Sequence, residues 1–368
     1  MKALSITPGK GNLKIIDTDE PQIQFPDDIK LKVLQVGICG TDREEVEGGR
    51  ADAPSNEDHL IIGHEMFGRV VDIGKDVSKV KKGDYALFIV RRGCGKCYPC
   101  LNDRSDMCYT GQYKERGIKG LHGYQAEFVV DSEKYIVKVP EEIASIGVLA
   151  EPMSVIEKAI DDSLLLQEAR IPGVKASDWL EGRKALVAGL GPVGLLSAVA
   201  LRLKNAKVFG LDIVDENSKR PSLLKAIGGE YIDGRQIKTT DIDEKLGDMD
   251  FVLEAAGITK LEFQLLDTIG INGIYVLSGI PGGNRPVNIL GDELIRKMVL
   301  MNHVWLGSVN ASIQHYDMAI SDLQKARIKW KDIIEEIITD KFHYTDFTRA
   351  FEVDSSKGIK TVIEWDSI

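Results

Sequence analysis

The chain has 368 residues, of which 43% are hydrophobic and 28% charged, and this composition is typical of a globular protein with room for two domains. Its 57 acidic and 47 basic residues give a net charge of −10, which repels a phosphate backbone and argues against nucleic acid as a partner. No apolar run approaches the ~20 residues that span a bilayer, and the first residues lack the charged-then-apolar build of a signal peptide. We therefore expect a cytoplasmic protein with no membrane partner.

The first 155 residues are predicted to form many short strands. Apolar and polar residues alternate within short runs, and Gly and Pro separate the runs. The clearest runs are "DIKLKVLQVGI" from Asp28, "GRVVDIG" from Gly68, "YALFIV" from Tyr85 and "AEFVVDSEKYIVKVP" from Ala126. This pattern is typical of a mostly β domain.

Residues 91–110 hold four of the five cysteines of the chain. They follow the spacing Cys-x2-Cys-x2-Cys-x7-Cys and are Cys94, Cys97, Cys100 and Cys108. The odd total disfavours a disulfide framework, and a redox pair would explain two cysteines but not four. Four thiolates on short loops can surround one tetrahedral zinc. Because four sulfurs leave no position for a substrate, we expect this zinc to be structural.

From about residue 180 strands and helices alternate. Buried strands are predicted in "RKALVAGL", "AKVFGLDIV", "MDFVLEAAG" and "GIYVLSGI", and helices in "GPVGLLSAVALRLKN" and "KLEFQLLDTIG". This alternation predicts a doubly wound parallel sheet, so the fold class is α/β. The tail contains a helix, a strand and a helix in "IIEEIITDKFHYTDFTRAFEV" and a last strand in "IKTVIEW". The segment "LLLQEARIPGVKASDWLEGR" is predicted to be a linker or a surface insertion.

The sequence "VAGLGPVG" places three glycines between a predicted strand and a predicted helix. The glycines are Gly189, Gly191 and Gly194, and Pro192 and Val193 lie between the last two. In a G-x-G-x-x-G motif the first glycine permits the tight turn, the second admits the pyrophosphate and the third allows close packing of helix and strand. The anion then lies at the helix N-terminus. We therefore predict a dinucleotide site.

Asp212 lies at the end of the second strand of this domain, 18 residues after Gly194. A carboxylate at that place accepts hydrogen bonds from the ribose 2′-hydroxyl and repels a 2′-phosphate, which favours NAD over NADP. Lys219 and Arg220 follow in the same loop and are suited to receive a phosphate, so NADP stays open.

A second group of ligand-type residues lies in the β-rich part of the chain. It consists of Cys39 in "GICGTD", His64 and Glu65 in "IIGHEMFG", and Glu151 in "LAEPMS". One thiolate, one imidazole and one or two carboxylates leave an open position on zinc, as a catalytic site requires. Asp42 is placed to accept a hydrogen bond from the imidazole of His64. Taken singly, a cysteine or histidine such as Cys39 or His64 is more often a packed core residue than a metal ligand. The spacing of these residues alone does not decide between the two roles.

The motifs and their order resemble those of the zinc-dependent medium-chain dehydrogenases. "GHEMFGRVVDIGKDV" matches the G-H-E-x2-G-x5-G-x2-V pattern of that family, and the four-cysteine segment and "GLGPVG" follow at the family's spacing. Within the family, "GICGTDR", "RRGCGKC", "GIKGLHG" and "VLAEPMSVIEKAI" are most similar to the archaeal-type glucose dehydrogenases and polyol dehydrogenases. The resemblance implies a GroES-like catalytic domain of residues 1–155 and 305–368 and a Rossmann cofactor domain of residues 156–304, in a tetramer or dimer.

The resemblance also implies roles for single residues. It makes Cys39, His64 and Glu151 zinc ligands, Glu65 an exchangeable ligand or close neighbour of the ion, and Thr41 the hydroxyl that relays the substrate proton. Sugar hydroxyls would contact Glu115 and Asn310. The cofactor would contact Ser278, Gly279, Ile280 and Lys360.

At three positions the chain departs from the glucose enzymes. Val90, Val155 and Leu300 stand where some of those enzymes carry Asn, Asp and His. A sugar hydroxyl left unpaired in a buried site costs about 1–3 kcal/mol, so glucose itself is in question and another aldose or a polyol is a plausible substrate.

These features predict a zinc-dependent oxidoreductase that transfers hydride from a sugar, at C1 of an aldose, or from a polyol hydroxyl to NAD(P). An alcohol or amino-alcohol dehydrogenase of the same fold is the alternative within enzymes. An inactive cofactor-binding protein is the alternative outside them, although the ligand-type residues and the glycines are all present. A cysteine-rich nucleic-acid module conflicts with the net charge.

Overall fold

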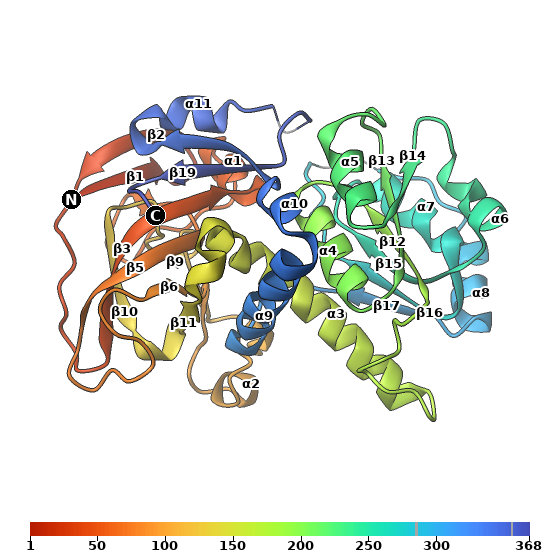
Figure 1. Ribbon diagram of the computed structural model, residues 1–368, viewed down its shortest axis with the longest axis horizontal. Coiled ribbons are helices and arrows are strands. Elements are labelled where there is room, and N and C mark those ends of the chain that lie inside the picture. Colours follow the sequence, from red (N-terminus) through yellow and green to blue (C-terminus); the bar gives the residue numbers. More distant parts are fainter. Residues whose placement is uncertain (284–285, 355) are drawn as a thin grey trace. The chain divides into compact units, whose positions relative to one another are not determined.

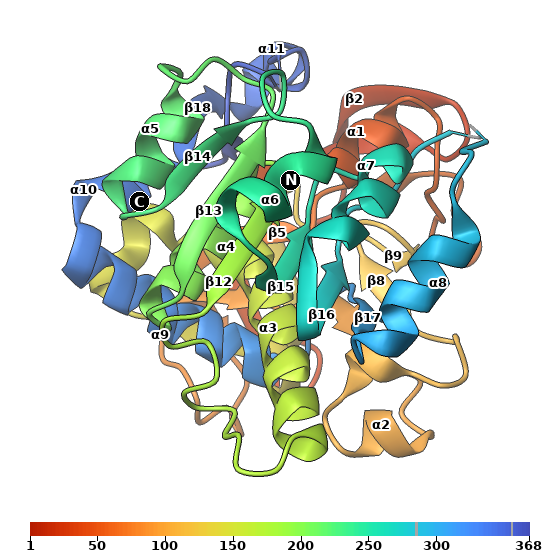
Figure 2. The same cartoon turned by 90° about the vertical axis from the view of Figure 1, so that its right-hand side faces the viewer.

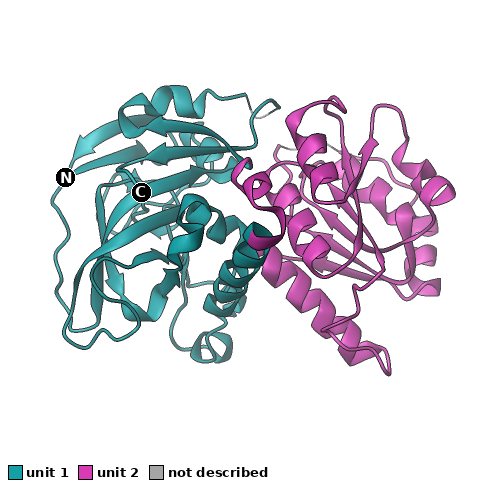
Figure 3. Cartoon of the chain, viewed as in Figure 1, with its two compact units in different colours: residues 1–154, 310–327, 337–368 teal, residues 155–309, 328–336 magenta. Residues whose placement is uncertain are grey.

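A computed structural model describes residues 1–283, 286–354 and 356–368 of the chain. These residues form two compact units (Figure 3). Unit 1 consists of residues 1–154, 310–327 and 337–368, and unit 2 of residues 155–309 and 328–336. In the described ranges every helix is too short or too polar to cross a bilayer.

Unit 1 is built around a seven-stranded sheet in which the segment from Asp28 is central (Figure 1). Its order is β11-β6-β5-β3-β19-β18, and β10 also pairs with β3. The strands are β3 (Asp28–Ile38), β5 (Glu65–Ile73), β6 (Tyr85–Phe88), β10 (Phe128–Ser132), β11 (Ile136–Val139), β18 (Ile338–His343) and β19 (Lys360–Glu364). Val33, Val36 and Phe67 are fully buried, because β3 and β5 are covered on both faces along most of their length.

Two three-stranded sheets and several short helices complete unit 1. One sheet contains β1 (Lys2–Thr7), β2 (Gly11–Asp17) and β4 (Leu60–Ile61), and the other contains β7 (Arg91–Arg92), β8 (Lys114–Arg116) and β9 (Gly120–Leu121). The helices are α1 (Gly40–Val46), α2 (Tyr98–Leu101) and α11 (Phe347–Phe351), with 3-10 turns at Ser105–Met107, Glu133–Tyr135, Glu141–Leu149 and Tyr344–Asp346. Helix α9 (Ile313–Trp330) begins in unit 1, and α10 (Asp332–Glu335) belongs to unit 2.

Unit 2 contains a six-stranded parallel sheet with helices on both faces (Figure 2). The order is β14-β13-β12-β15-β16-β17, with strands β12 (Lys184–Ala188), β13 (Lys207–Asp212), β14 (Glu230–Asp233), β15 (Met249–Glu254), β16 (Ile269–Leu277) and β17 (Val304–Gly307). The helices are α4 (Pro192–Leu203), α5 (Lys219–Ala226), α6 (Ile242–Leu246), α7 (Thr259–Gln264) and α8 (Gly291–Leu300), with 3-10 turns at Thr239–Asp241 and Leu265–Thr268. In chain order this is 3-2-1-4-5-6, the order of dinucleotide-binding sheets. The predicted α/β class is confirmed.

The prediction for residues 164–183 is wrong in part. A 21-residue helix, α3 (Ala150–Arg170), runs through Leu164 and continues for seven residues of the segment expected to be a linker or insertion. Further on, Trp179 and Leu180 are buried. The leucine run was ambiguous because α3 lacks a strong amphipathic pattern, so its helical period is hard to recognise.

Candidate functional site

Cys39 occupies the N-cap of helix α1. Its Sγ accepts a hydrogen bond from the amide of Thr41 at 3.2 Å, and Asp42 in turn accepts one from the amide of Cys39 at 2.8 Å. This reciprocal cap fixes the position of the thiol at the N-terminus of the helix. Thr41 is half-buried beside the sulfur.

His64 and Glu65 reach Cys39 through the pairing of β3 with β5. Glu65 is the first residue of β5 and pairs with Gly37 of β3, two residues before Cys39. A side chain at Gly37 would collide with the Glu65 carboxylate, so the glycine makes room for it. The Nε2 of His64 then lies 3.1 Å from the Sγ of Cys39. Ligand atoms of Cys39, His64 and Glu65 all lie within 4.8 Å of one another, as metal ligands must.

The charges around this cluster favour a cation. Burial would lower the pKa of His64, but the Cys39 thiolate and the Asp42 carboxylate raise it well above its usual value. The His64 Nδ1 and an oxygen of Asp42 are 3.4 Å apart. A set of sulfur, nitrogen and oxygen donors in which His64 and Glu65 are buried, and which stabilises positive charge, fits zinc.

Glu151 and Lys360 adjoin the same cluster. Burial raises the pKa of Glu151 to about 7, and the nearby Glu65 adds to this while His64 opposes it. Glu151 is therefore near His64 and Glu65, but it is outside the group of three whose ligand atoms meet. Lys360 is 1% exposed; its ammonium pairs with Glu65 and donates to the carbonyl of Ile38 at 3.1 Å. The partners of the Lys360 ammonium within unit 1 are thus Glu65 and Ile38. The predicted contact of Lys360 with a cofactor stays a prediction.

The structure brings the four clustered cysteines together as thiols. The Sγ atoms of Cys94 and Cys100 are 3.9 Å apart, and so are those of Cys97 and Cys108. Tetrahedral zinc with bonds of about 2.3 Å places its sulfurs about 3.8 Å apart, whereas a disulfide needs about 2.05 Å. All five cysteines are free. The geometry fits a closed four-sulfur zinc site.

Glu115 and Asn310, 195 positions apart, are hydrogen-bonded to each other. The amide nitrogen of Asn310 donates to Oε1 of Glu115 at 2.7 Å. Asn310 has a positive φ of 62°, and its own oxygen accepts from the amide of Ala311 at 2.8 Å. Arg91 also donates to Oε1 of Glu115, a contact that the sequence did not predict. Strands β7 and β8 are too short to be recognised from a residue pattern, so no signal pointed to this pairing.

The three glycines of the dinucleotide motif lie between β12 and α4. Gly189 has a φ of +87°, and a side chain at Gly194 would collide with the carbonyl oxygen of Gly189. Gly191 caps α4 and faces open space, and Pro192 is the first residue of the helix. A left-handed turn, a clear approach to the backbone and a tight strand–helix contact are the requirements for binding a pyrophosphate.

Asp212 and the segment Ser278–Ile280 lie at the carboxyl ends of their strands, as the motif does. Asp212 ends β13; it accepts from the amide of Leu190 at 2.8 Å, and Arg220 lies 3.5 Å from the same oxygen. Ser278 and Gly279 follow β16, and their amides donate to the carbonyl of Glu254 at 3.0 Å. Ile280 is 57% exposed. In parallel sheets, cofactors bind along this edge.

A third group of ligand-type residues does not suit a metal. Glu57, His59 and His122 have ligand atoms within 4.8 Å of one another. The amide of Ile61 donates to Nδ1 of His122 at 3.1 Å, so the ring proton is on Nε2, which faces Glu57 at 2.8 Å. A protonated nitrogen cannot bind a metal.

Comparisons with known proteins agree with this arrangement. Residues 144–365 match the family model "Glucose dehydrogenase C-terminus", and residues 25–141 match "Alcohol dehydrogenase GroES-like domain". The glucose 1-dehydrogenase of Methanocella arvoryzae is 33% identical over 366 residues, and glucose 1-dehydrogenase 2 of Vulcanisaeta moutnovskia is 37% identical over 365; both alignments cover 99% of each chain. The solved structure of Haloferax mediterranei glucose dehydrogenase in complex with NADP, Zn and gluconolactone matches with a TM-score of 0.89 and 32% identity over 100% of both chains.

The fold, the matched family models and the full-length relatives define a class, the zinc-dependent medium-chain dehydrogenases. The chain belongs to this family, in its glucose 1-dehydrogenase branch. It is an NAD(P)-dependent oxidoreductase of CH–OH groups, which confirms the predicted enzyme class. The predicted preference for NAD is not supported, because the Haloferax mediterranei structure contains NADP.

Proposed function

We propose that the chain oxidises a ring hydroxyl of a sugar, at C1 of an aldose, and passes the hydride to NAD(P). The observation that carries this proposal is the Asn310–Glu115 hydrogen bond of 2.7 Å, because the resemblance implies that each of these two residues contacts sugar hydroxyls. An amide and a carboxylate side by side offer both a donor and acceptors to a hydroxylated ring. Unit 1 then supplies the catalytic groups and unit 2 the cofactor site.

We assign the catalytic zinc to Cys39, His64 and Glu151, with Glu65 as the exchangeable neighbour. The mutual approach of Cys39, His64 and Glu65 supports this assignment, and Glu151, buried beside them, adds a second carboxylate. Lys360 compensates the charge of Glu65 and so holds that carboxylate when it is not a ligand. The four clustered cysteines would hold a second, structural zinc.

Zinc, when bound, lowers the pKa of the substrate hydroxyl towards neutrality, which is the chemistry that the site needs from it. The hydroxyl of Thr41 would relay the proton to solvent; the backbone amide of Thr41 donates a hydrogen bond to Sγ of Cys39 and so holds this residue beside the sulfur. Asp42 orients His64 and leaves its Nε2 facing Cys39. Loss of the C1 hydride to the nicotinamide converts a cyclic aldose into its lactone.

The cofactor is assigned to the glycine motif and the neighbouring strand ends. The open space over Gly191 and the free N-terminus of α4 support pyrophosphate binding there. Asp212 suits the ribose 2′-hydroxyl of NAD and Arg220 suits the 2′-phosphate of NADP. The proposal therefore includes both cofactors. Exchange of Asp212 for Ala should raise the kcat/KM ratio of NADP over NAD by about 10-fold, since a nearby like charge costs about 1–2 kcal/mol against the phosphate. An unchanged ratio would mean that another group recognises the ribose.

The substrate itself is tested with a panel of aldoses, polyols, short alcohols and amino alcohols, each with NAD and with NADP, by following formation of the reduced cofactor. We expect aldoses to give the highest kcat/KM. Faster oxidation of short alcohols would favour the alcohol or amino-alcohol dehydrogenase. No turnover with any compound in zinc-loaded protein would favour the inactive cofactor-binding protein. Of the departures from the glucose enzymes, Val90 is buried, as Glu115 is, and Leu300 is 73% exposed. The oligomeric state stays a prediction.

A further inference from the structure

The guanidinium of Arg91 lies between Glu115 and the four-cysteine segment. Its Nε and Nη2 donate to Oε1 of Glu115 at 3.1 and 2.8 Å, and its Nη1 donates to the carbonyl of Asp106 at 2.9 Å. The guanidinium carbon lies 3.8 Å from the ring centroid of Tyr113, and the residue is 5% exposed. A planar guanidinium with three engaged nitrogens fixes the relative positions of both partners.

The carboxylate of Glu115 is held by one oxygen and open at the other. Oε1 accepts two hydrogen bonds from Arg91 and one from Asn310. Among the residues that the structure describes, none donates to Oε2, and this oxygen is not one of the buried polar atoms left without a partner. The arrangement therefore leaves one accessible acceptor, in an orientation that Arg91 sets.

Asp106 belongs to the segment that the four sulfurs enclose. It lies in the 3-10 turn Ser105–Met107, between Cys100 and Cys108. It is 5% exposed, and its carboxylate pairs with Arg104 at 2.9 Å. The position of its carbonyl is thus set by the fold of this segment, which a zinc on the four cysteines would close.

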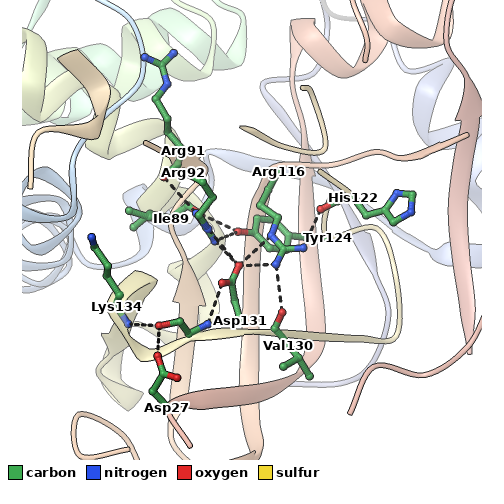
Figure 4. A network of polar contacts seen from close by, with 11 residues as sticks. Asp27, Ile89, Arg91, Arg92, Arg116, His122, Tyr124, Val130, Asp131 and Lys134 are labelled. Atoms are coloured by element: carbon green, nitrogen blue, oxygen red, sulfur yellow. Dashed lines mark hydrogen bonds and ion pairs between the residues drawn. The ribbon is translucent and has the colours of Figure 1, made fainter. Parts of the chain in front are cut away.

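Arg92, the next residue of β7, provides a matched control on the opposite face. It is buried to a similar degree and pairs with Asp131 at 2.7 Å, which Arg116 also contacts. Figure 4 shows Arg92 and Arg116 converging on Asp131 while Arg91 points away from them. No hydrogen bond or ion pair joins Arg92 to Glu115 in the described part of the chain.

We propose that Arg91 is a positioning residue that couples the four-cysteine segment to the substrate-binding carboxylate of Glu115. The proposal rests on the proposed function in so far as Glu115 binds a sugar hydroxyl. It gives the four-cysteine segment a second role besides stability: loss of its metal releases the carbonyl of Asp106, frees the guanidinium and lets Glu115 rotate. Sugar affinity should then fall although the catalytic cluster is intact.

The first test compares Arg91→Met with Arg92→Met in zinc-loaded protein, using the best aldose of the panel. Because hydrogen bonds to a charged group are lost, Arg91→Met should raise KM about 10- to 100-fold with kcat within about 3-fold, and Arg92→Met should change KM less than about 2-fold. In a Glu115→Gln background, Arg91→Met should add less than about 2-fold. Equal effects of the two arginine variants, or full additivity with Glu115→Gln, would overturn the proposal.

The second test does not depend on turnover. Both arginine variants are made with Cys39→Ser, which empties the catalytic site, and release of the remaining zinc to a chelating dye is followed. Arg91→Met should release it at least about 5-fold faster than Arg92→Met, because the link to Asp106 is cut. Equal release rates would overturn the coupling. If wild-type protein oxidises no sugar, the proposed function fails, and this second test still decides the proposal about Arg91.

Discussion

The two cysteine-containing clusters of unit 1 place sulfur in different settings. The four-cysteine cluster uses a single donor type from one short segment, and the surrounding surface is exposed at Tyr98 and Tyr109. The Cys39 cluster combines a thiol, an imidazole and a carboxylate from segments that β3 and β5 bring together, and His64 and Glu65 are buried. A closed set of local donors suits stability, and an open set of mixed donors suits chemistry, which supports the proposal that the isolated cysteine takes part in catalysis.

Exchange of Cys39 for Ser should have the largest effect on turnover. Serine is a good N-cap, so its hydroxyl can accept from the amide of Thr41 and the fold of α1 should survive. Loss of the thiolate should remove zinc and, at several kcal/mol of lost stabilisation, reduce kcat by at least about 10³-fold. Metal analysis, circular dichroism and initial rates check this. Zinc and turnover both retained in the variant would show that Cys39 is not a ligand.

Exchange of Asp42 for Ala tests the support of the Cys39 cluster without touching a ligand. The variant loses the acceptor for the Cys39 amide and the negative charge 3.4 Å from His64. Zinc affinity and kcat/KM should each fall about 10- to 100-fold, as is usual when a partner of a ligating histidine is removed. Glu44→Ala, at an exposed position of the same helix, is the control and should leave both unchanged. Equal zinc affinities of the two variants would contradict the role of Asp42.

Exchange of Cys100 for Ser should act on stability first. Cys100 is the buried member of the four-cysteine cluster, and its Sγ is 3.9 Å from that of Cys94. Opening a closed zinc site should lower Tm by about 5–10 °C, corresponding to about 2–3 kcal/mol, while kcat per catalytic zinc changes less than about 3-fold. Differential scanning calorimetry and rates normalised to metal content check this. A loss of kcat at unchanged Tm would reverse the assignment of the two clusters.

The sequence predicted those parts of the site that depend on local pattern. The glycine motif, the four cysteines and the strands around Asp28 and Lys184 are recognisable because turn residues and periodicity specify them. The contact of Arg91 with Glu115 and the pairing of Lys360 with Glu65 depend on long-range strand pairing, which no local pattern encodes. The helical part of residues 164–183 is hard to recognise from the sequence, because Leu165 and Leu166 are exposed next to the buried Leu164 and blur the amphipathic pattern.

Glu45 extends the contrast between the clusters to pH dependence. It is fully buried on α1, and neither carboxylate oxygen has a hydrogen-bond partner among the described residues. Burial, and then the charge of Asp42, raise the pKa of Glu45 to about 9, from 4.5 for an exposed glutamate. No comparable buried carboxyl without a partner occurs near the four cysteines in the described chain, since Asp106 pairs with Arg104.

The sign of the effect follows from which state holds the proton. Between about pH 4.5 and 9 the folded protein keeps the proton of Glu45 and the unfolded chain has lost it, so the free energy of unfolding falls as pH rises through this window. Glu45→Gln cannot ionise, and in zinc-free protein its Tm should fall a few °C less than that of wild type between about pH 6 and 9. Glu44→Gln, exposed on the same helix, should follow wild type. Bound zinc should reduce this difference in Tm between wild type and Glu45→Gln, because a cation beside Asp42 and His64 favours the ionised carboxylate of Glu45. Parallel curves of Tm against pH for the two zinc-free proteins would show that Glu45 is ionised in the folded state.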